Sequence, residues 1–279
     1  MHEGRAAIPF FPELVSKKIS ESSSQPTPSS AFSIYSNGQS FYEWLHSPPQ
    51  VERNVNFNLA MRSVAQTEGL AFLPVDYPFN ALPVNKVIVD VGGGIGALPA
   101  ALLPSLPDHS FIVQDLAPVV SQANSTEDPC MRDWIMKGKV RFCIQDFFAP
   151  QPPELNGAVF VIKNVINRHN YGDSEALNIL LSLRKSTPYR LLLIDRLVIP
   201  QLGKIHKVQA TEIAGNAAGS QRGATLYDLV MASLHGGKNR TLEEWSRLLV
   251  LGGFRLESVF PLRASTGQAV IEATCIEGS

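Results

Sequence analysis

The chain has 279 residues, of which 44% are hydrophobic and 18% charged, and its formal net charge is −1. This composition can bury a sizeable core, and the balanced charge gives no basic field for nucleic acid or an anionic membrane, so neither is an expected partner. The three cysteines have neither disulfide-framework nor metal-ligand spacing, so no metal site is expected. No apolar run is long enough to span a bilayer, and we expect a cytoplasmic protein.

The first part of the chain divides into two pieces. Residues 1–39 contain a short apolar fragment and a Ser/Pro-rich stretch, and we expect them to be irregular. Residues 40–80 predict a helical connector with a short helix near Phe41 and a longer one over 51–66. In the longer helix, apolar residues recur near helical spacing and are expected to pack on the rest of the molecule: Val51, Val55, Leu59 and Val64.

Residues 81–279 alternate predicted strands and helices. Five strand–helix units are followed by two strands joined by a short turn, which should pair antiparallel. The last helix opens with a capping-box pattern, Thr241 with Glu244. The expected strands are 87–91, 110–115, 139–145, 158–162, 190–195, 255–262 and 268–275. We therefore predict an α/β fold: a doubly wound, mostly parallel, seven-stranded Rossmann-like sheet with a C-terminal antiparallel hairpin.

The glycines after the first predicted strand indicate a ligand that contains a nucleoside. A strand that breaks at glycines and restarts as a helix lets the backbone approach a ligand at the helix N-terminus. Asp115 ends the next strand, 25 positions after Asp90, where a carboxylate can bind both hydroxyls of a ribose. The pattern Gly92-x-Gly94-x-x-Ala97 also fits a looser dinucleotide fingerprint, and a glycine turn without any nucleotide is the plain structural alternative.

Acidic residues near the glycines favour S-adenosylmethionine over a nicotinamide dinucleotide. Asp90 lies two residues before the first glycine, where a dinucleotide site usually stays apolar and where an acid suits a positive amino group. Asp146 and Phe147 close the third strand and offer an acid for an exocyclic amine beside an aromatic face for a purine. Lys163 follows the fourth strand, where its ammonium could reach the edge of the cofactor. Together these residues resemble the S-adenosylmethionine site of class I methyltransferases.

Candidate catalytic groups follow the carboxyl ends of the later strands, where ligands bind in open α/β sheets. His169 lies between the fourth strand and the next helix, Asp195 ends the fifth strand, and Asn239 precedes the capped helix. Methyl transfer to a phenol requires removal of its proton, and a histidine is the natural base near neutral pH. Asp195 could fix the tautomer of His169. His46 and His109 have no comparable context and are expected at the surface.

Five motifs in order resemble the plant and fungal class I O-methyltransferases of the caffeate type: 90–96, 146–148, 169–173, Asp195 and 237–245. The resemblance covers about residues 40–275. It implies S-adenosyl-L-methionine as cofactor and a hydroxyl of a small aromatic or polyketide-like secondary metabolite as substrate. The positions that match its cofactor site are Gly92, Asp115, Leu116, Asp146, Phe147 and Lys163, to which Asp90 and Gly94 are added here. His169 matches the base, Asp195 and Asn239 match the two acids that flank it, and Phe57, Met61 and Met231 are the expected substrate contacts.

The chain also departs from the family pattern. Lys163 precedes His169 by six residues where the family usually has four, and Asn239 replaces a glutamate, so it can orient an imidazole but cannot balance its charge. Only the tail of the family's N-terminal winged-helix dimerisation domain is expected here, which leaves its usual homodimer open. The alternatives are a protein that binds the cofactor but catalyses a pericyclic or dehydration step, and a truncated, inactive paralogue.

Overall fold

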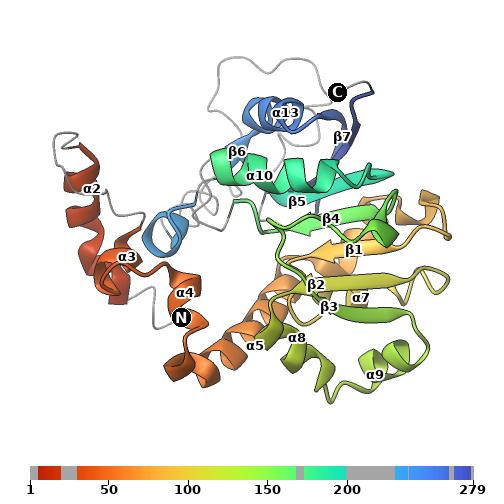
Figure 1. Cartoon of the computed structure of the whole chain (residues 1–279), viewed down its shortest axis with the longest axis horizontal. Helices are drawn as coiled ribbons and strands as arrows, with labels where there is room; N and C mark the ends of the chain where they lie inside the picture. Colours follow the sequence, from red (N-terminus) through yellow and green to blue (C-terminus); the bar gives the residue numbers. More distant parts are fainter. Residues whose placement is uncertain are drawn as a thin grey trace.

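The computed structural model describes residues 6–19, 30–167, 173–198, 230–237, 239–263 and 267–277 (Figure 1). A sheet runs through its centre in the order β3-β2-β1-β4-β5-β8-β7. The main-path strands are β1 (Ile88–Val91), β2 (Phe111–Asp115), β3 (Val140–Ile144), β4 (Val159–Lys163), β5 (Arg190–Val198), β7 (Phe254–Pro261) and β8 (Gln268–Cys275). The two-residue β6 (Arg240–Thr241) pairs with the end of β5. Strands β1 to β5 are parallel and β8 pairs antiparallel with both β5 and β7, which confirms the predicted sheet and hairpin.

The reversal of strand order between β1 and β4 places a crevice at the carboxyl edge of the sheet. Chain segments leave β1 and β4 toward opposite sides at this point, and such a switch point is where open α/β sheets bind their ligands. Every residue of β1 is buried, and β4 is buried up to Lys163. The crevice therefore opens at the end of two buried strands.

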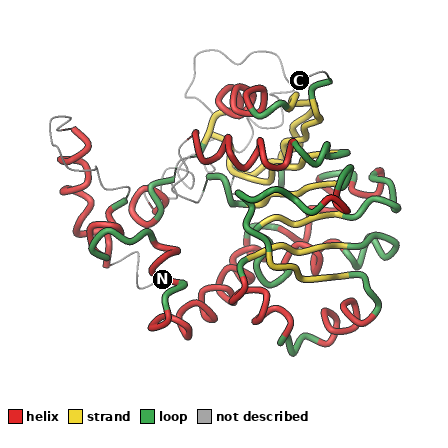
Figure 2. Tube along the Cα trace, in the orientation of Figure 1, coloured by secondary structure: helices red, strands yellow, loops and turns green. Residues whose placement is uncertain are grey.

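Helices cover both faces of the sheet (Figure 2). On one face, α10 (Asp173–Arg184) and α13 (Leu242–Leu251) pack on Val89 and Phe160, with Trp245 fully buried. On the other, α7 (Ala97–Leu102) and α9 (Pro129–Met136) share a second core with Val161. Helix α8 (Ala117–Asn124) follows β2. The predicted capping box is confirmed, because the Thr241 hydroxyl accepts from Glu244 N–H and the Glu244 carboxylate accepts from Thr241 N–H.

The N-terminal helices form a smaller body with its own aromatic core (Figure 1). They are η1 (Ile8–Phe10), α2 (Phe11–Ile19), α3 (Ala31–Tyr35) and α4 (Phe41–Leu45). Phe32 is fully buried, and the centroid of its ring lies 5.3 Å from the ring centroids of Phe41 and of Trp44. Leu234, in the helical residues 230–234, belongs to the same cluster. The irregular conformation expected for 1–39 is therefore wrong for its described residues, because aromatic packing stabilises short helices that local sequence alone does not specify.

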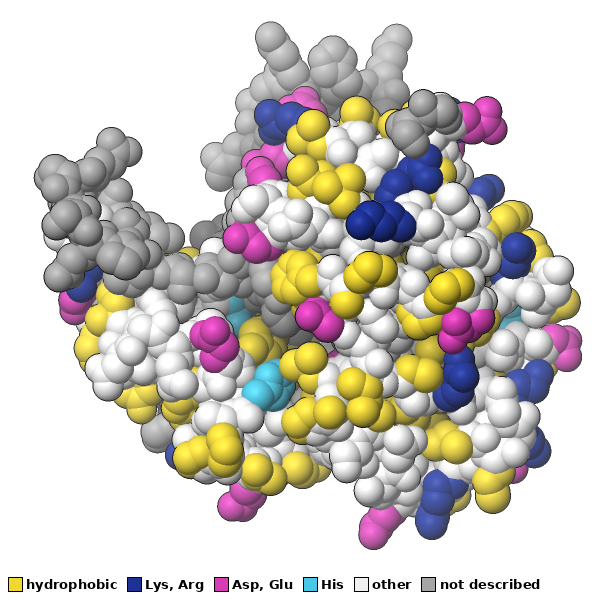
Figure 3. All heavy atoms as spheres, in the orientation of Figure 1, with side chains coloured by type: hydrophobic (Ala, Val, Ile, Leu, Met, Phe, Trp, Pro, Cys, Tyr) yellow, Lys and Arg dark blue, Asp and Glu magenta, His cyan; other side chains and the backbone are white. Residues whose placement is uncertain are grey.

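The connector is helical, as predicted. The side of its long helix that packs on the rest of the molecule is not the side that the apolar stripe predicts. It comprises η2 (Pro48–Gln50), α5 (Val51–Thr67), η3 (Leu70–Phe72), α6 (Leu73–Asp76) and η4 (Phe79–Ala81). Val51, Val55 and Leu59 are 65%, 38% and 48% exposed, so the expected packing of this apolar stripe is wrong. Figure 3 shows hydrophobic side chains on the surface where the start of α5 lies in Figure 1. The inner face carries both apolar and polar residues: Phe57, Met61 and Ala65 line the cavity, and Asn58 Nδ2 donates to Gln122 Oε1 on α8 at 2.7 Å.

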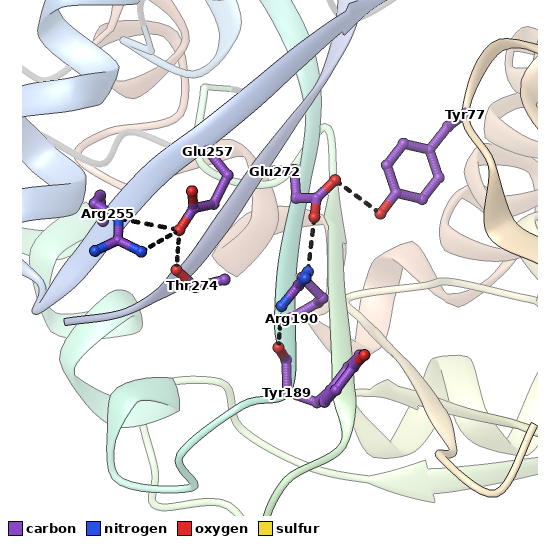
Figure 4. A network of polar contacts seen from close by, with 7 residues as sticks. All are labelled: Tyr77, Tyr189, Arg190, Arg255, Glu257, Glu272 and Thr274. Atoms are coloured by element: carbon purple, nitrogen blue, oxygen red, sulfur yellow. Dashed lines mark hydrogen bonds and ion pairs between the residues drawn. The ribbon is translucent and has the colours of Figure 1, made fainter. Parts of the chain in front are cut away.

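A polar network joins the segment before β1 to strand β8 and to the amino end of β5 (Figure 4). Tyr77 Oη donates to Glu272 on β8 at 3.1 Å, and Arg190 Nε donates to the same carboxylate at 2.7 Å. Burial and the nearby Glu272 carboxylate raise the pKa of the Tyr77 phenol, so it stays neutral. The network lies at the amino end of β5, away from the carboxyl-edge crevice.

Among the described residues, no helix combines the length and apolarity that crossing a bilayer requires.

Candidate cofactor and active site

A cavity of about 680 Å³ opens at the carboxyl edge of the sheet. Residues at the ends of β1, β2 and β4, and in the turns that follow β1 to β4, make its floor. Residues of α4 and α5 make the wall opposite this floor. This volume lies within the range of sites that hold a small molecule or cofactor. The wall residues from the connector are Ser40, Tyr42, Glu43, His46, Phe57, Asn58, Met61, Arg62 and Ala65.

The glycine turn after β1 leaves no room for a side chain at Gly92 or Gly93, and its backbone conformation disfavours one at Gly94. Gly92 and Gly94 have φ of +67° and +61°, a conformation that other residues rarely adopt. A Cβ on Gly93 would lie 2.3 Å from Asp90 Oδ2, and one on Gly92 would lie 2.9 Å from Val165 Cγ2. Glycine at these positions therefore lets the backbone and the Asp90 carboxylate share the floor of the cavity.

Asp90 is almost fully buried beneath this turn. Burial raises the pKa of its carboxyl to about 7; the Lys163 ammonium opposes the shift and the Asp115 carboxylate adds to it. A buried carboxyl with a pKa near 7 is only partly ionised at neutral pH. A ligand that carries a positive charge would stabilise its ionised form.

Asp115 is fixed in position by two backbone N–H groups. Its Oδ2 accepts from Gly94 N–H at 2.8 Å, and its Oδ1 accepts from Leu116 N–H at 2.8 Å. Burial raises the pKa of Asp115, while these two donors and the nearby His46 lower it. The glycine turn and the tip of β2 thus form one unit, with carboxylate lone pairs left for the hydroxyls of a ribose.

All eight residues predicted to hold the cofactor line this one cavity: Asp90, Gly92, Gly94, Asp115, Leu116, Asp146, Phe147 and Lys163. Asp146 caps its own turn by accepting from Phe148 N–H at 2.9 Å, and the Phe147 and Phe148 rings pack edge to face. Of the expected substrate contacts, Phe57 and Met61 line the cavity, whereas Met231 is buried outside its lining.

Two of the three expected catalytic residues, Asp195 and Asn239, lie among the residues that the structure describes. His169 and Lys238 lie outside the described residues. Asp195 and Asn239 are buried and do not line the cavity. Asp195 accepts from the N–H groups of Arg196, at 2.9 Å, and Asn167, at 3.4 Å.

Asn167 occupies the position four residues after Lys163, which is the usual spacing of the family's base. It is 1% exposed, and its amide is engaged at both ends: Nδ2 donates to Arg196 O at 3.2 Å, and Oδ1 accepts from Arg240 Nη1 at 2.9 Å. Arg240 is fully buried and pairs with Asp173 at 2.9 Å. An amide held in this way cannot accept a substrate proton.

The surface position expected for His109 is wrong, whereas His46 is partly exposed. His109 is buried, with Nε2 3.2 Å from Leu82 O. His46 lines the cavity, where burial lowers its pKa and the Asp115 carboxylate opposes that shift. Glu68 is a further residue that the sequence did not single out; it is 5% exposed and contacts Lys163. No local sequence pattern indicates where His46 and Glu68 lie, because both positions depend on how α4 and α5 pack over the sheet.

The strand order, the terminal hairpin and the nucleoside-type cavity at the carboxyl edge define the fold of class I methyltransferases. Residues 21–255 match the model of the O-methyltransferase domain family, and the chain belongs to this family. Its members use S-adenosylmethionine as methyl donor. This finding confirms the family that the sequence motifs indicate.

Known proteins show the same relationship. The O-methyltransferase VdtC of Byssochlamys spectabilis is 28% identical over 237 residues, which cover 83% of this chain and 51% of that protein. The mitomycin 7-O-methyltransferase MmcR superposes with a TM-score of 0.71 at 25% identity, over 97% of this chain and 67% of that one. NcsB1, solved with S-adenosyl-L-homocysteine and 1,4-dihydroxy-2-naphthoic acid, gives 0.70 at 26% identity, over 97% and 69%. The chain spans about half the length of the curated relatives it matches.

Proposed function

We propose that this chain binds S-adenosylmethionine and methylates a hydroxyl of a small aromatic or polyketide-like secondary metabolite. The observation that carries the proposal is the convergence of four strand ends on one cavity, with Asp115 held by the N–H groups of Gly94 and Leu116. The proposal is also supported by membership of the O-methyltransferase domain family.

The residues present fit such a cofactor. The free lone pairs of Asp115 would bind the ribose hydroxyls, and Asp146 with Phe147 would bind the amine and the face of the adenine. Asp90 would lie near the positive amino group. Phe57 and Met61 would form an apolar wall on the opposite side, where an aromatic substrate can stack and water is excluded. The bound cofactor supplies an activated methyl group, and the chain itself has to orient the acceptor and remove its proton.

We assign the proton transfer to His169, with Asp195 and Asn239 as its orienting neighbours. Asp195 holds the N–H of Asn167, two residues before His169, so it fixes the backbone from which this histidine follows. Asn239 can accept a hydrogen bond from an imidazole or donate one to it, but a neutral amide does not balance the charge of an imidazolium. A base near neutral pH contributes typically about 10²–10⁴-fold to such a step.

The test is incubation of the full chain with methyl-labelled S-adenosylmethionine and a panel of hydroxylated aromatic and polyketide-like compounds. Transfer of label to an oxygen, with stoichiometric S-adenosylhomocysteine, is the expected result. Cofactor binding without transfer to any acceptor would contradict the assigned reaction and would favour an inactive paralogue.

A second candidate function is a step that retains the cofactor but transfers no methyl group, such as a pericyclic or dehydration reaction. The observation that favours it is Asn167, a locked amide at the usual spacing of the base, together with Asn239 in place of a glutamate. Conversion of a substrate without consumption of S-adenosylmethionine would establish this alternative.

A further inference from the structure

A buried carboxylate joins the end of α5 to the carboxyl edge of the sheet. Glu68 directly follows α5, and its Oε1 accepts from Arg196 Nη2 on β5 at 2.8 Å. Its Oε2 accepts from Asn164 Nδ2 and from Gln268 Nε2 on β8, both at 3.3 Å, and lies 3.8 Å from Lys163 Nζ on β4. Segments up to 200 positions apart in the chain thus meet at one side chain.

Two of these partners belong to the wall of the cofactor cavity. Lys163 and Asn164 both line the cavity. Asn164 has a φ of +56°, which is uncommon for a residue other than glycine, and its N–H donates to Ile194 O at 3.0 Å. Gln268 Nε2 also donates to Asn164 Oδ1 at 2.9 Å, so the amide is held from two sides. Glu68 therefore contacts the groups that shape this wall.

The cluster places two cations beside one carboxylate in a region of low exposure. The side chains of Lys163 and Arg196 are 13% and 6% exposed, and that of Glu68 is 5% exposed. Buried charges of one sign are costly unless an opposite charge offsets them. Without Glu68, Lys163 and Arg196 would lose the carboxylate that offsets their positive charge.

We propose that Glu68 is a positioning residue of the cofactor site, which holds Lys163 and Asn164 in the wall and offsets the cationic charge there so that a positively charged sulfonium can bind. This inference rests on the proposed function, because it takes S-adenosylmethionine as the ligand. It makes a prediction that a purely structural role does not make. S-adenosylmethionine carries a positive sulfur and S-adenosylhomocysteine a neutral one, so loss of the Glu68 charge should weaken binding of the first much more than of the second.

The size of the effect follows from Coulomb's law. At roughly 10 Å and an effective dielectric constant of about 20, one unit charge changes the binding of a monovalent cation by about tenfold. In Glu68→Gln, the dissociation constant of S-adenosylmethionine should therefore rise about tenfold relative to that of S-adenosylhomocysteine. The glutamine retains an acceptor for Arg196, so the fold should survive the exchange.

The experiment is titration calorimetry of the full chain with both ligands at pH 8.5 and low salt, above the pKa of about 7 to which burial raises the Asp90 carboxyl of the wild type. The matched control is Glu272→Gln in the polar network of Figure 4, which also removes a carboxylate that accepts from an arginine but lies away from the cavity. This control should lower the thermal stability and leave the ratio of the two dissociation constants unchanged. Wild-type protein that binds neither ligand would refute the proposed function itself, whatever Glu68 does.

A second variant keeps the inference testable should Glu68→Gln not fold. Lys163→Met removes one cation and leaves Glu68 in place, so the ratio of the dissociation constants should shift in the opposite direction, in favour of S-adenosylmethionine. In the double variant the ratio should return toward that of the wild type. Equal weakening of both ligands in Glu68→Gln, or an unchanged ratio in Lys163→Met, would overturn the inference.

Discussion

Asp115→Asn tests the part of the site that the structure defines most closely. In the wild type, the two carboxylate oxygens of Asp115 accept one backbone N–H each, from Gly94 and from Leu116, at 2.8 Å. An asparagine has only one acceptor oxygen, so its NH₂ group must face one of these two N–H groups. Either Gly94 N–H, which joins the turn to the β2 tip, or the adjacent Leu116 N–H then loses its acceptor, and the ribose loses a charged acceptor.

The magnitude follows from these contacts. A hydrogen bond to a charged group contributes about 1.5–3 kcal/mol, so loss of one ribose contact should raise the dissociation constant of S-adenosylhomocysteine by about 10- to 100-fold. The unliganded protein should lose much less stability, because burial already disfavours the charged form of Asp115 and raises its pKa.

The assay is titration calorimetry with S-adenosylhomocysteine, with thermal unfolding of the unliganded variant as the stability measurement. Asp133→Asn is the matched control, since Asp133 is half-exposed and, among the described residues, its carboxylate pairs with Lys137 one helical turn away, at 2.7 Å. Ligand affinity in Asp115→Asn equal to that in Asp133→Asn would refute the assignment of Asp115 to the ribose.

Three further predictions follow. The raised pKa of Asp90, about 7 against 3.8 in the unfolded chain, means that its contribution to stability is complete below pH 3.8 and is lost as the pH rises to 7. Denaturant unfolding of the unliganded protein should show a loss of a few kcal/mol over this interval, and the same slope in Asp90→Asn would contradict it. Gly93→Ala should abolish tight ligand binding by displacing the Asp90 carboxylate, and calorimetry that finds wild-type affinity would exclude this displacement. His169→Ala should lower turnover by about 10²–10⁴ with nearly unchanged cofactor affinity, and equal loss of both would place His169 in the cofactor site instead.

The sheet could be predicted from the sequence because its signals are local. Continuous apolar runs specify strands buried on both faces, and the glycine turn and the capping box at Thr241 fix where strands and helices change over. The grouping of the eight residues predicted to hold the cofactor also follows, since the carboxyl ends of parallel strands meet at one edge of the sheet.

The orientation of α5 could not be predicted, because hydrophobic periodicity shows which face of a helix is apolar but not what that face contacts. The side of α5 that faces inward carries Phe57 and Met61 as well as Asn58, whose contact with Gln122 spans 64 positions. Glu68 is a similar case. Its hydrogen-bond partners lie 96 to 200 positions away, so nothing near it in the sequence distinguishes it from a solvent-exposed glutamate at a helix end.

The central claim is that the turn after β1 and the acid at the tip of β2 form a site for adenosine joined to a sulfonium amino acid. Calorimetry of the wild-type chain with S-adenosylhomocysteine and, separately, with a nicotinamide dinucleotide tests it most directly. We predict saturable heat with a stoichiometry of about one for the first ligand and none for the second. Heat with the dinucleotide alone, from well-folded protein, would contradict the claim.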